Sequence, residues 1–138
     1  MKHKKLRFLP FILIVIVLGG CQAINNSSTT KDDVNTFETI TANEAKEMMD
    51  NDNSLIILDV RTEEEYITGH IENALLLPYT EISDQVETVI TDKNTIILIY
   101  CRSGRRSLIA ANSLIDLGYK NVYDFGGIID WTYGIVTD

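Results

Sequence analysis

The chain has 138 residues, 45% of them hydrophobic, which suffices for one hydrophobic core after removal of a targeting segment but not for two. The formal net charge is −8, and because four of the twelve basic residues lie in the first seven positions, the remainder carries eight basic against twenty acidic side chains. A body this acidic repels nucleic acid and polyanionic membrane surfaces, so we expect no nucleic-acid partner.

The first twenty residues have the organisation of a secretory signal. A basic opening precedes the apolar run Phe8–Leu18, which is too short to cross about 30 Å of hydrocarbon as a helix. The sequence LGGC at positions 18–21 resembles a bacterial lipobox, in which the cysteine becomes the lipid-modified N-terminus. We therefore predict a lipoprotein signal peptide over 1–20, lipidation of Cys21 and anchoring to the extracytoplasmic face of the cell membrane. An ordinary signal peptide and a short uncleaved anchor are the alternatives.

The next segment is polar. Residues 22–36 are rich in Asn, Ser, Thr and Asp and cannot bury enough apolar surface to order themselves, so we predict a flexible tether over 21–36 and one domain over 37–136.

The cysteine count is low. The chain has two cysteines, and if Cys21 carries lipid, Cys101 is the sole free thiol and no internal disulfide can form. With His70 the only histidine outside the signal, a metal site is not expected.

From residue 37 onward, short apolar runs alternate with amphipathic segments. The predicted strands are Phe37–Ile40, Leu55–Val60, Ala74–Leu77, Thr95–Tyr100 and Val122–Phe125. The predicted helices are Ala42–Asp50, Glu63–Thr68, Glu81–Ile90 and Ser103–Leu117. The strands at 55–60 and 95–100 are almost continuously apolar, which is typical of a parallel sheet covered on both faces. Strands and helices that alternate in this way predict an open α/β domain.

Three predicted strands end in residues that are unusual for a core: Asp59–Arg61, Tyr100–Arg102 and Asp124–Gly127. The carboxyl ends of parallel strands share one edge of a sheet, where ligands bind, so we expect these residues to lie on one face of the domain.

Several polar residues near these ends have structural interpretations. The sequence TEEE at 62–65 has the form of a capping box, and we assign no chemistry to Glu63, Glu64 or Glu65. Asp59 and Arg61 are interpreted as an ion pair that braces two loops, with a catalytic acid and an anion clamp as the alternative. His70 follows a glycine in a turn and is expected to fasten that loop, with a general base as the alternative.

Cys101 is the strongest candidate for a reactive group. The sequence IILIYCRSGRRS at 96–107 carries a buried strand into a short loop and the start of a helix. Ser103 and Gly104 allow the backbone to curl with its N–H groups facing inward, and the helix adds its positive end. With the arginines at 102, 105 and 106, this environment predicts a reactive thiolate of low pKa that needs no histidine.

Taken together, these motifs resemble a single-domain rhodanese. The matching pieces, in order, are DVR at 59–61, EY at 65–66, GHI at 69–71, Ala74, Pro78, CRSGRRS at 101–107, the glycine pair at 126–127 and Trp131. The resemblance implies a five-stranded parallel sheet flanked by helices, an active-site loop from Cys101 to Arg106, and a catalytic cysteine that carries sulfur as a persulfide.

The function expected from this resemblance is ping-pong sulfur transfer from thiosulfate or a related donor to cyanide or a thiol. Cys101 would be the nucleophile, and the backbone amides of Arg102, Ser103, Gly104, Arg105 and Arg106 would hold the persulfide. Arg102 and Arg105 are the best candidates for binding the donor anion, whereas Arg106 has the alternative of turning outward. Neither a metal nor an organic cofactor is required.

Two other functions remain open. The same fold is shared with phosphatases and arsenate reductases, whose signature places an arginine six residues after the cysteine; here Ser107 stands there, and the loop fits the shorter sulfurtransferase form. A non-catalytic, surface-tethered binding module is the third possibility, although such modules usually lose the cysteine that this chain retains.

Overall fold

The computed structural model describes residues 35–137. In chain order the elements are β1 (Glu38–Thr39), α1 (Ala42–Asn51), β2 (Ile56–Asp59), α2 (Glu63–Ile67), β3 (Leu75–Leu76), α3 (Ile82–Val89), β4 (Ile96–Cys101), α4 (Arg105–Asp116), β5 (Asn121–Gly127) and the 3-10 turn η1 (Ile128–Asp130). Every predicted strand and helix is present, with ends that differ by at most two residues. The predicted signal peptide, Cys21 and nearly all of the predicted tether lie outside the described residues.

The five strands form one parallel sheet in the order β1-β5-β4-β2-β3, which confirms the predicted α/β fold. The chain moves outward from β2 to β3, returns to β4 and continues to β5 on the other side, so the order reverses between β2 and β4. In open α/β sheets the crevice at the carboxyl ends of two such strands is the usual ligand position. Helices α2 and α4 begin at that crevice, after β2 and β4 respectively.

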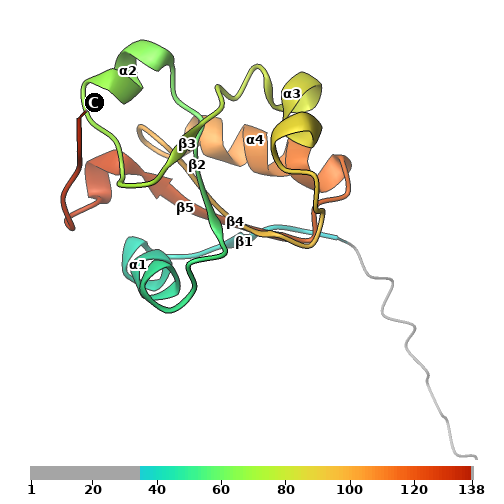
Figure 1. Cartoon of the computed structure of the whole chain (residues 1–138), viewed down its shortest axis with the longest axis horizontal. Helices are drawn as coiled ribbons and strands as arrows, with labels where there is room; N and C mark the ends of the chain where they lie inside the picture. The colour runs from blue at the N-terminus through green and yellow to red at the C-terminus, as the bar shows by residue number, and fades with distance from the viewer. Residues whose placement is uncertain (1–34, 138) are drawn as a thin grey trace, which may run out of the picture. The chain divides into compact units, whose positions relative to one another are not determined.

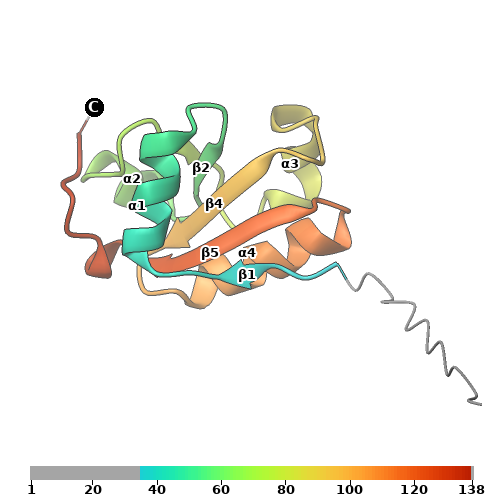
Figure 2. The same cartoon turned by 90° about the horizontal axis from the view of Figure 1, so that it is seen from below.

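Helices cover both faces of the sheet. Figures 1 and 2 show α1 on one face and α3 and α4 on the other. Successive residues of β4 alternate between the two faces: Ile97, Ile99 and Cys101 join the core that includes α3 and α4, whereas Leu98 and Tyr100 join the core that includes α1. Because side chains alternate along a strand, the Cys101 side chain lies on the α4 side of the sheet.

Helix α4 buries a narrower face than the sequence pattern predicts. Ala110, Ala111 and Leu114 are fully buried against the sheet, but Leu108 is 44% exposed, so the broad apolar face that the spacing of Leu108, Ala111 and Ile115 predicts is wrong at Leu108. Gly118 follows the helix with a φ of +90°, a left-handed conformation that glycine adopts without strain.

Asp59 and Arg61 form the predicted brace, with the two side chains 0% and 5% exposed. The Arg61 guanidinium donates to both carboxylate oxygens of Asp59, at 2.6 to 3.0 Å, and to the carbonyl oxygen of Gly69 at 2.8 Å. The Tyr100 hydroxyl donates to Asp59 at 2.6 Å and accepts from the Ile71 amide. These contacts join β2, β4 and the loop before β3 through one buried carboxylate.

His70 also has the predicted structural position. Its ring stacks on Tyr66 with centroids 3.7 Å apart, and Nδ1 lies 3.1 Å from the Tyr66 carbonyl oxygen. The backbone of His70 pairs with that of Val136 in both directions, which fastens the loop before β3 to the C-terminal segment.

Within residues 35–137, no helix combines the length and the apolar character that crossing a bilayer requires.

We predict that Asp59→Asn destabilises the domain by about 3 kcal/mol, because the buried Arg61 cation loses its counter-charge. The measurement is urea denaturation of a fragment covering residues 35–137. Asp50→Asn is the matched control, since Asp50 pairs with Lys46 at the surface and its loss costs at most about 0.5 kcal/mol. Equal stabilities of the two variants would contradict the bracing role of Asp59.

Candidate functional site

Strand β4 places the Cys101 sulfur directly beneath the first turn of α4. The side chain is 1% exposed, and the Gly104 amide donates to Sγ at 3.1 Å. Gly104 is the N-cap of α4, has a φ of +97°, and has no side chain to cap the helix. The thiol sulfur therefore accepts from an amide at the positive end of the helix, which favours the ionised form.

The net effect of this environment is a lowered pKa for the Cys101 thiol, below its ordinary value of 9.0. Burial alone raises the pKa, but hydrogen bonds outweigh it: they come from the Ser107 amide and hydroxyl and from the amides of Ser103 and Gly104. The Ser107 hydroxyl lies 3.7 Å from Sγ. Of the amides predicted to face the sulfur, those of Ser103 and Gly104 act on it, and Ser107 joins them although the sequence pattern did not indicate it.

The three arginines of the loop have different environments. Arg102 and Arg105 are exposed, so their guanidinium groups are accessible to an anion from solvent. Arg106 is partly buried and forms a bidentate ion pair with Glu65, with N–O distances of 2.6 and 2.7 Å. The alternative in which Arg106 simply turns outward is therefore wrong, and Glu65 has a contact that its capping-box role did not predict.

The Glu65–Arg106 pair changes the acidity of both groups. Hydrogen bonds from Arg106 lower the pKa of Glu65 from 4.5 to about 2, against a smaller opposing effect of burial. The pKa of Arg106 is raised, first by the hydrogen bonds to Glu65 and also, more weakly, by the Cys101 side chain. Glu65 retains its capping role, since its carboxylate also accepts from the Thr62 amide at 3.1 Å.

The end of β5 closes the other side of the loop. A register irregularity between β4 and β5 pairs Cys101 with Gly127, next to Gly126 with its φ of +88°. A side chain at Gly127 would bring a Cβ to 2.4 Å from the Arg102 carbonyl oxygen, so only glycine fits. Irregularities of this kind are frequent beside active sites because they redirect the backbone.

Asp124 is a second buried carboxyl close to the site. It is 2% exposed and accepts from the Gly126 amide at 3.0 Å. Burial raises its pKa, and hydrogen bonds from the Gly126 amide and the Ser107 side chain act in the opposite direction.

No grouping of three or more His, Cys, Asp or Glu side chains suited to a metal occurs within residues 35–137.

The sequence-predicted residues therefore separate into two groups. Residues 101–106 form one loop around the sulfur, as expected. Asp59, Arg61 and His70 brace neighbouring segments through contacts with one another's loops. The fold and the site together define a class: a small α/β domain with a thiol held in an amide-lined loop at the carboxyl edge of a parallel sheet.

Comparisons with known proteins agree with this class. The family model of the Rhodanese-like domain matches residues 41–133, and the chain therefore belongs to the rhodanese family. It is 36% identical over 73 residues to thiosulfate sulfurtransferase PspE of Escherichia coli (strain K12), which covers 53% of this chain and 70% of that protein. Two further relatives are longer proteins. The match covers 46% of the putative sulfur carrier protein YrkF of Bacillus subtilis (strain 168) and 30% of a tRNA uridine(34) hydroxylase of Photorhabdus laumondii.

Solved structures give the same result. A rhodanese-like domain protein from Staphylococcus aureus is 33% identical with a TM-score of 0.66, and the match covers 74% of this chain and 99% of that chain. A rhodanese with anions from E. coli is 32% identical with a TM-score of 0.57, over 60% of this chain and 98% of that one. Together these relatives support a function of the sulfurtransferase type.

We predict that the Cys101 thiol ionises below the ordinary value of 9.0 and that Ser107→Ala moves its pKa upward, because the amides remain but the hydroxyl is lost. The measurement is the rate of alkylation by iodoacetamide as a function of pH. A lowered pKa means that the rate reaches its plateau at lower pH than for an unperturbed thiol. Ser113→Ala on the same helix is the control, since the Ser113 hydroxyl hydrogen-bonds Ile109. Identical profiles for the two variants would contradict the role of Ser107.

Proposed function

We propose that the protein transfers sulfane sulfur through a persulfide on Cys101. The thiolate attacks the outer sulfur of thiosulfate; a new S–S bond forms at Sγ, the S–S bond of the donor breaks, and sulfite leaves with its electron pair. Cyanide or a thiolate then attacks the outer sulfur of the persulfide and regenerates the Cys101 thiolate. Atoms and charges balance in both steps without a further reactant.

The observation that carries this proposal is the amide donor aimed at the sulfur. The Gly104 amide lies 3.1 Å from Sγ, and the amides of Ser103 and Ser107 also lower the pKa of the thiol. A persulfide adds one sulfur beyond Sγ and is itself an anion at neutral pH, so donors arranged around the thiolate also suit the intermediate.

The charge of the loop supports an anionic donor. Arg102 and Arg105 are exposed beside the buried thiol, in a chain whose formal net charge is −8. A local group of guanidinium charges on an acidic protein attracts small anions and not large polyanions. The names of two relatives agree: one is a thiosulfate sulfurtransferase and the other a rhodanese with anions.

The proposal predicts that the fragment of residues 35–137 forms thiocyanate from thiosulfate and cyanide, and that Cys101→Ser abolishes this activity, because the persulfide has no attachment atom. After incubation with thiosulfate alone, mass spectrometry should show one added sulfur on Cys101. Equal activity of the two proteins would end the sulfurtransferase proposal. Cys101-dependent hydrolysis of an aryl phosphate, without sulfur transfer, would instead support the phosphatase alternative.

We further propose that Cys21 anchors the protein to the extracytoplasmic face of the membrane. The support is the lipobox-like sequence at 18–21 after a short apolar run. Two acyl chains hold a protein stably on a bilayer, at about 0.8 kcal/mol per buried CH₂ group.

The anchor predicts that Cys21→Ser moves the full-length protein from the membrane fraction to the soluble fraction of its bacterial host. Detection by immunoblot after cell fractionation is sufficient, and Ser27→Ala in the predicted tether is the control. Continued membrane retention of Cys21→Ser would show that the sequence at 18–21 is not a lipidation signal.

A further inference from the structure

An ion pair between α2 and α4 connects the end of the Cys101 loop to a segment distant in the sequence. Glu65 and Arg106 are 41 residues apart and meet because β2 and β4 are neighbours in the sheet. Both oxygens of the carboxylate accept from the guanidinium, at 2.6 and 2.7 Å, so the pair has a defined orientation and not only a favourable charge.

Arg106 is the second residue of α4 and the last residue of the Cys101 loop, with a side chain 23% exposed. An arginine side chain has four rotatable bonds, and an unpaired one beside solvent samples many orientations. The bidentate contact selects one of them, in which the Cys101 side chain also contributes to the raised pKa of the guanidinium. Arg106 stands between Gly104 and Ser107, which both contact the sulfur, while its guanidinium is held by Glu65.

We propose that Glu65 is a positioning residue for the reaction of Cys101, which fixes the Arg106 side chain at the end of the Cys101 loop without itself contacting substrate. The effect on sulfur transfer rests on the proposed function, whereas the arrangement of Glu65, Arg106 and Cys101 does not. A cation fixed in the loop around the sulfur favours the thiolate and the persulfide over their neutral forms, and the raised pKa of Arg106, with Cys101 among its weaker causes, agrees with this effect.

The alternatives to positioning make opposite predictions. If Glu65 acted only through its negative charge, its removal would leave a more positive site and would favour the thiolate. If Glu65 served only the capping box of α2, any loss of that box would have the same effect on Cys101. Positioning predicts that removal of Glu65 disfavours the thiolate, because Arg106 moves away into solvent.

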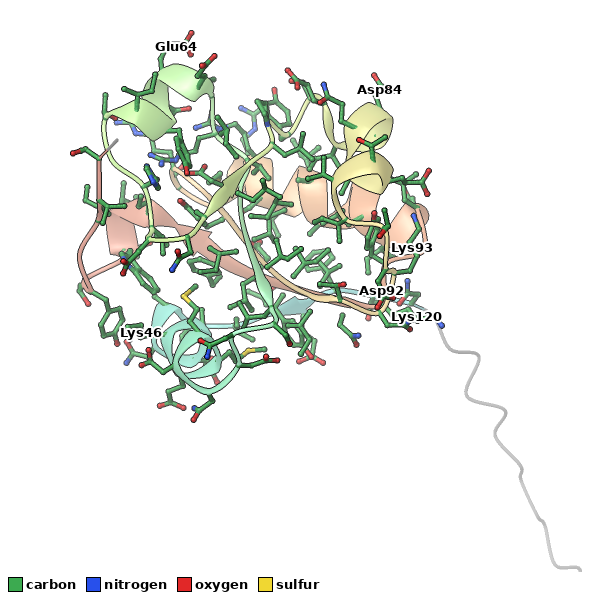
Figure 3. All side chains as sticks on the ribbon, viewed as in Figure 1. Lys46, Glu64, Asp84, Asp92, Lys93 and Lys120 are labelled. Atoms are coloured by element: carbon green, nitrogen blue, oxygen red, sulfur yellow. The ribbon has the colours of Figure 1, made fainter. Side chains whose placement is uncertain are left out.

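Other charged groups lie near these residues. Glu65 also interacts with Arg61, and Glu64 lies beside it on α2. On the other side of the sulfur, Asp124 of β5 reaches the site through Ser107. Figure 3 shows Glu64 pointing outward from α2, which makes Glu64→Gln a matched control for Glu65→Gln on the same short helix.

The experiment measures alkylation of Cys101 by iodoacetamide, a neutral probe that needs no anion site, as a function of pH. We expect Glu65→Ala to slow alkylation about threefold at pH values below the thiol pKa, and Glu65→Gln to slow it less, since one hydrogen bond from Arg106 can remain. Glu64→Gln should match the wild type. Arg106→Ala should slow alkylation as Glu65→Ala does, and the double variant should be no slower than either.

Thr62→Ala separates positioning from helix stability. It removes the hydroxyl that accepts from the Glu65 amide and so breaks the capping box, but leaves the Glu65–Arg106 pair in place. The proposal expects Thr62→Ala to lower thermal stability with little change in alkylation. Equal slowing by Thr62→Ala and Glu65→Ala, or faster alkylation of Glu65→Ala, would overturn it.

The readout also separates this inference from the proposed function. Alkylation does not depend on sulfur transfer, so an inactive wild type with the expected alkylation pattern would overturn only the sulfurtransferase proposal. A wild type that transfers sulfur, with a Glu65→Ala variant that alkylates at the wild-type rate, would overturn only the positioning role.

Discussion

The hydrogen bond from the Gly104 amide to the Cys101 sulfur is the contact on which the site depends. It requires a strand that ends at residue 101, a left-handed residue at 104 and a helix that begins at 105, with Arg102 and Ser103 between the strand and the left-handed residue. Each requirement is met by a local property: the apolar β-branched run of β4, the lack of a Cβ at Gly104, and the helix-forming residues after it. The burial of the sulfur would otherwise disfavour the thiolate.

The reversal of strand order between β2 and β4 gives this loop its neighbours. It places the start of α2 next to the start of α4, so that a carboxylate from one helix meets a guanidinium from the other. On the opposite side, β5 pairs with the end of β4 and brings the two consecutive glycines against the loop backbone. The buried Asp59 network then joins β2 and β4 below this point, which gives the crevice a rigid base.

Much of this arrangement is visible in the sequence because it depends on local patterns. The alternation of elements, the cysteine at the end of an apolar strand and the capping box at Thr62 are properties of short segments. Contacts between distant segments cannot be predicted from such local patterns. The sequence TEEE correctly predicts that Glu65 belongs to the capping box, but nothing within its own helix indicates that it also pairs with Arg106. The signal that could have indicated it is the strand order, which places α2 and α4 together once β2 and β4 are taken as neighbours.

A physical reason also explains why the sequence pattern does not show which of Ser107 and Leu108 is buried. Both follow the loop on the first turn of α4, where a rotation of one residue, about 100°, exchanges the buried and the exposed side. The apolar pattern favours Leu108 as the buried residue, whereas the structure buries Ser107 on the side of α4 that faces the sulfur. Ser107 lies four and seven residues before Ala111 and Leu114, so the three side chains share the buried face of the helix and Leu108 is turned away from it.

The missing side chain at Gly127 has a consequence for the size of substrate that the loop can accept. Backbone there touches backbone, with no room even for a methyl group. Widening the loop for a bulkier substrate would press on the last residues of β5, a strand that is hydrogen-bonded to β1 and β4. The size of the opening is thereby coupled to the sheet, and substitutions in the loop alone are a poor route to changing it.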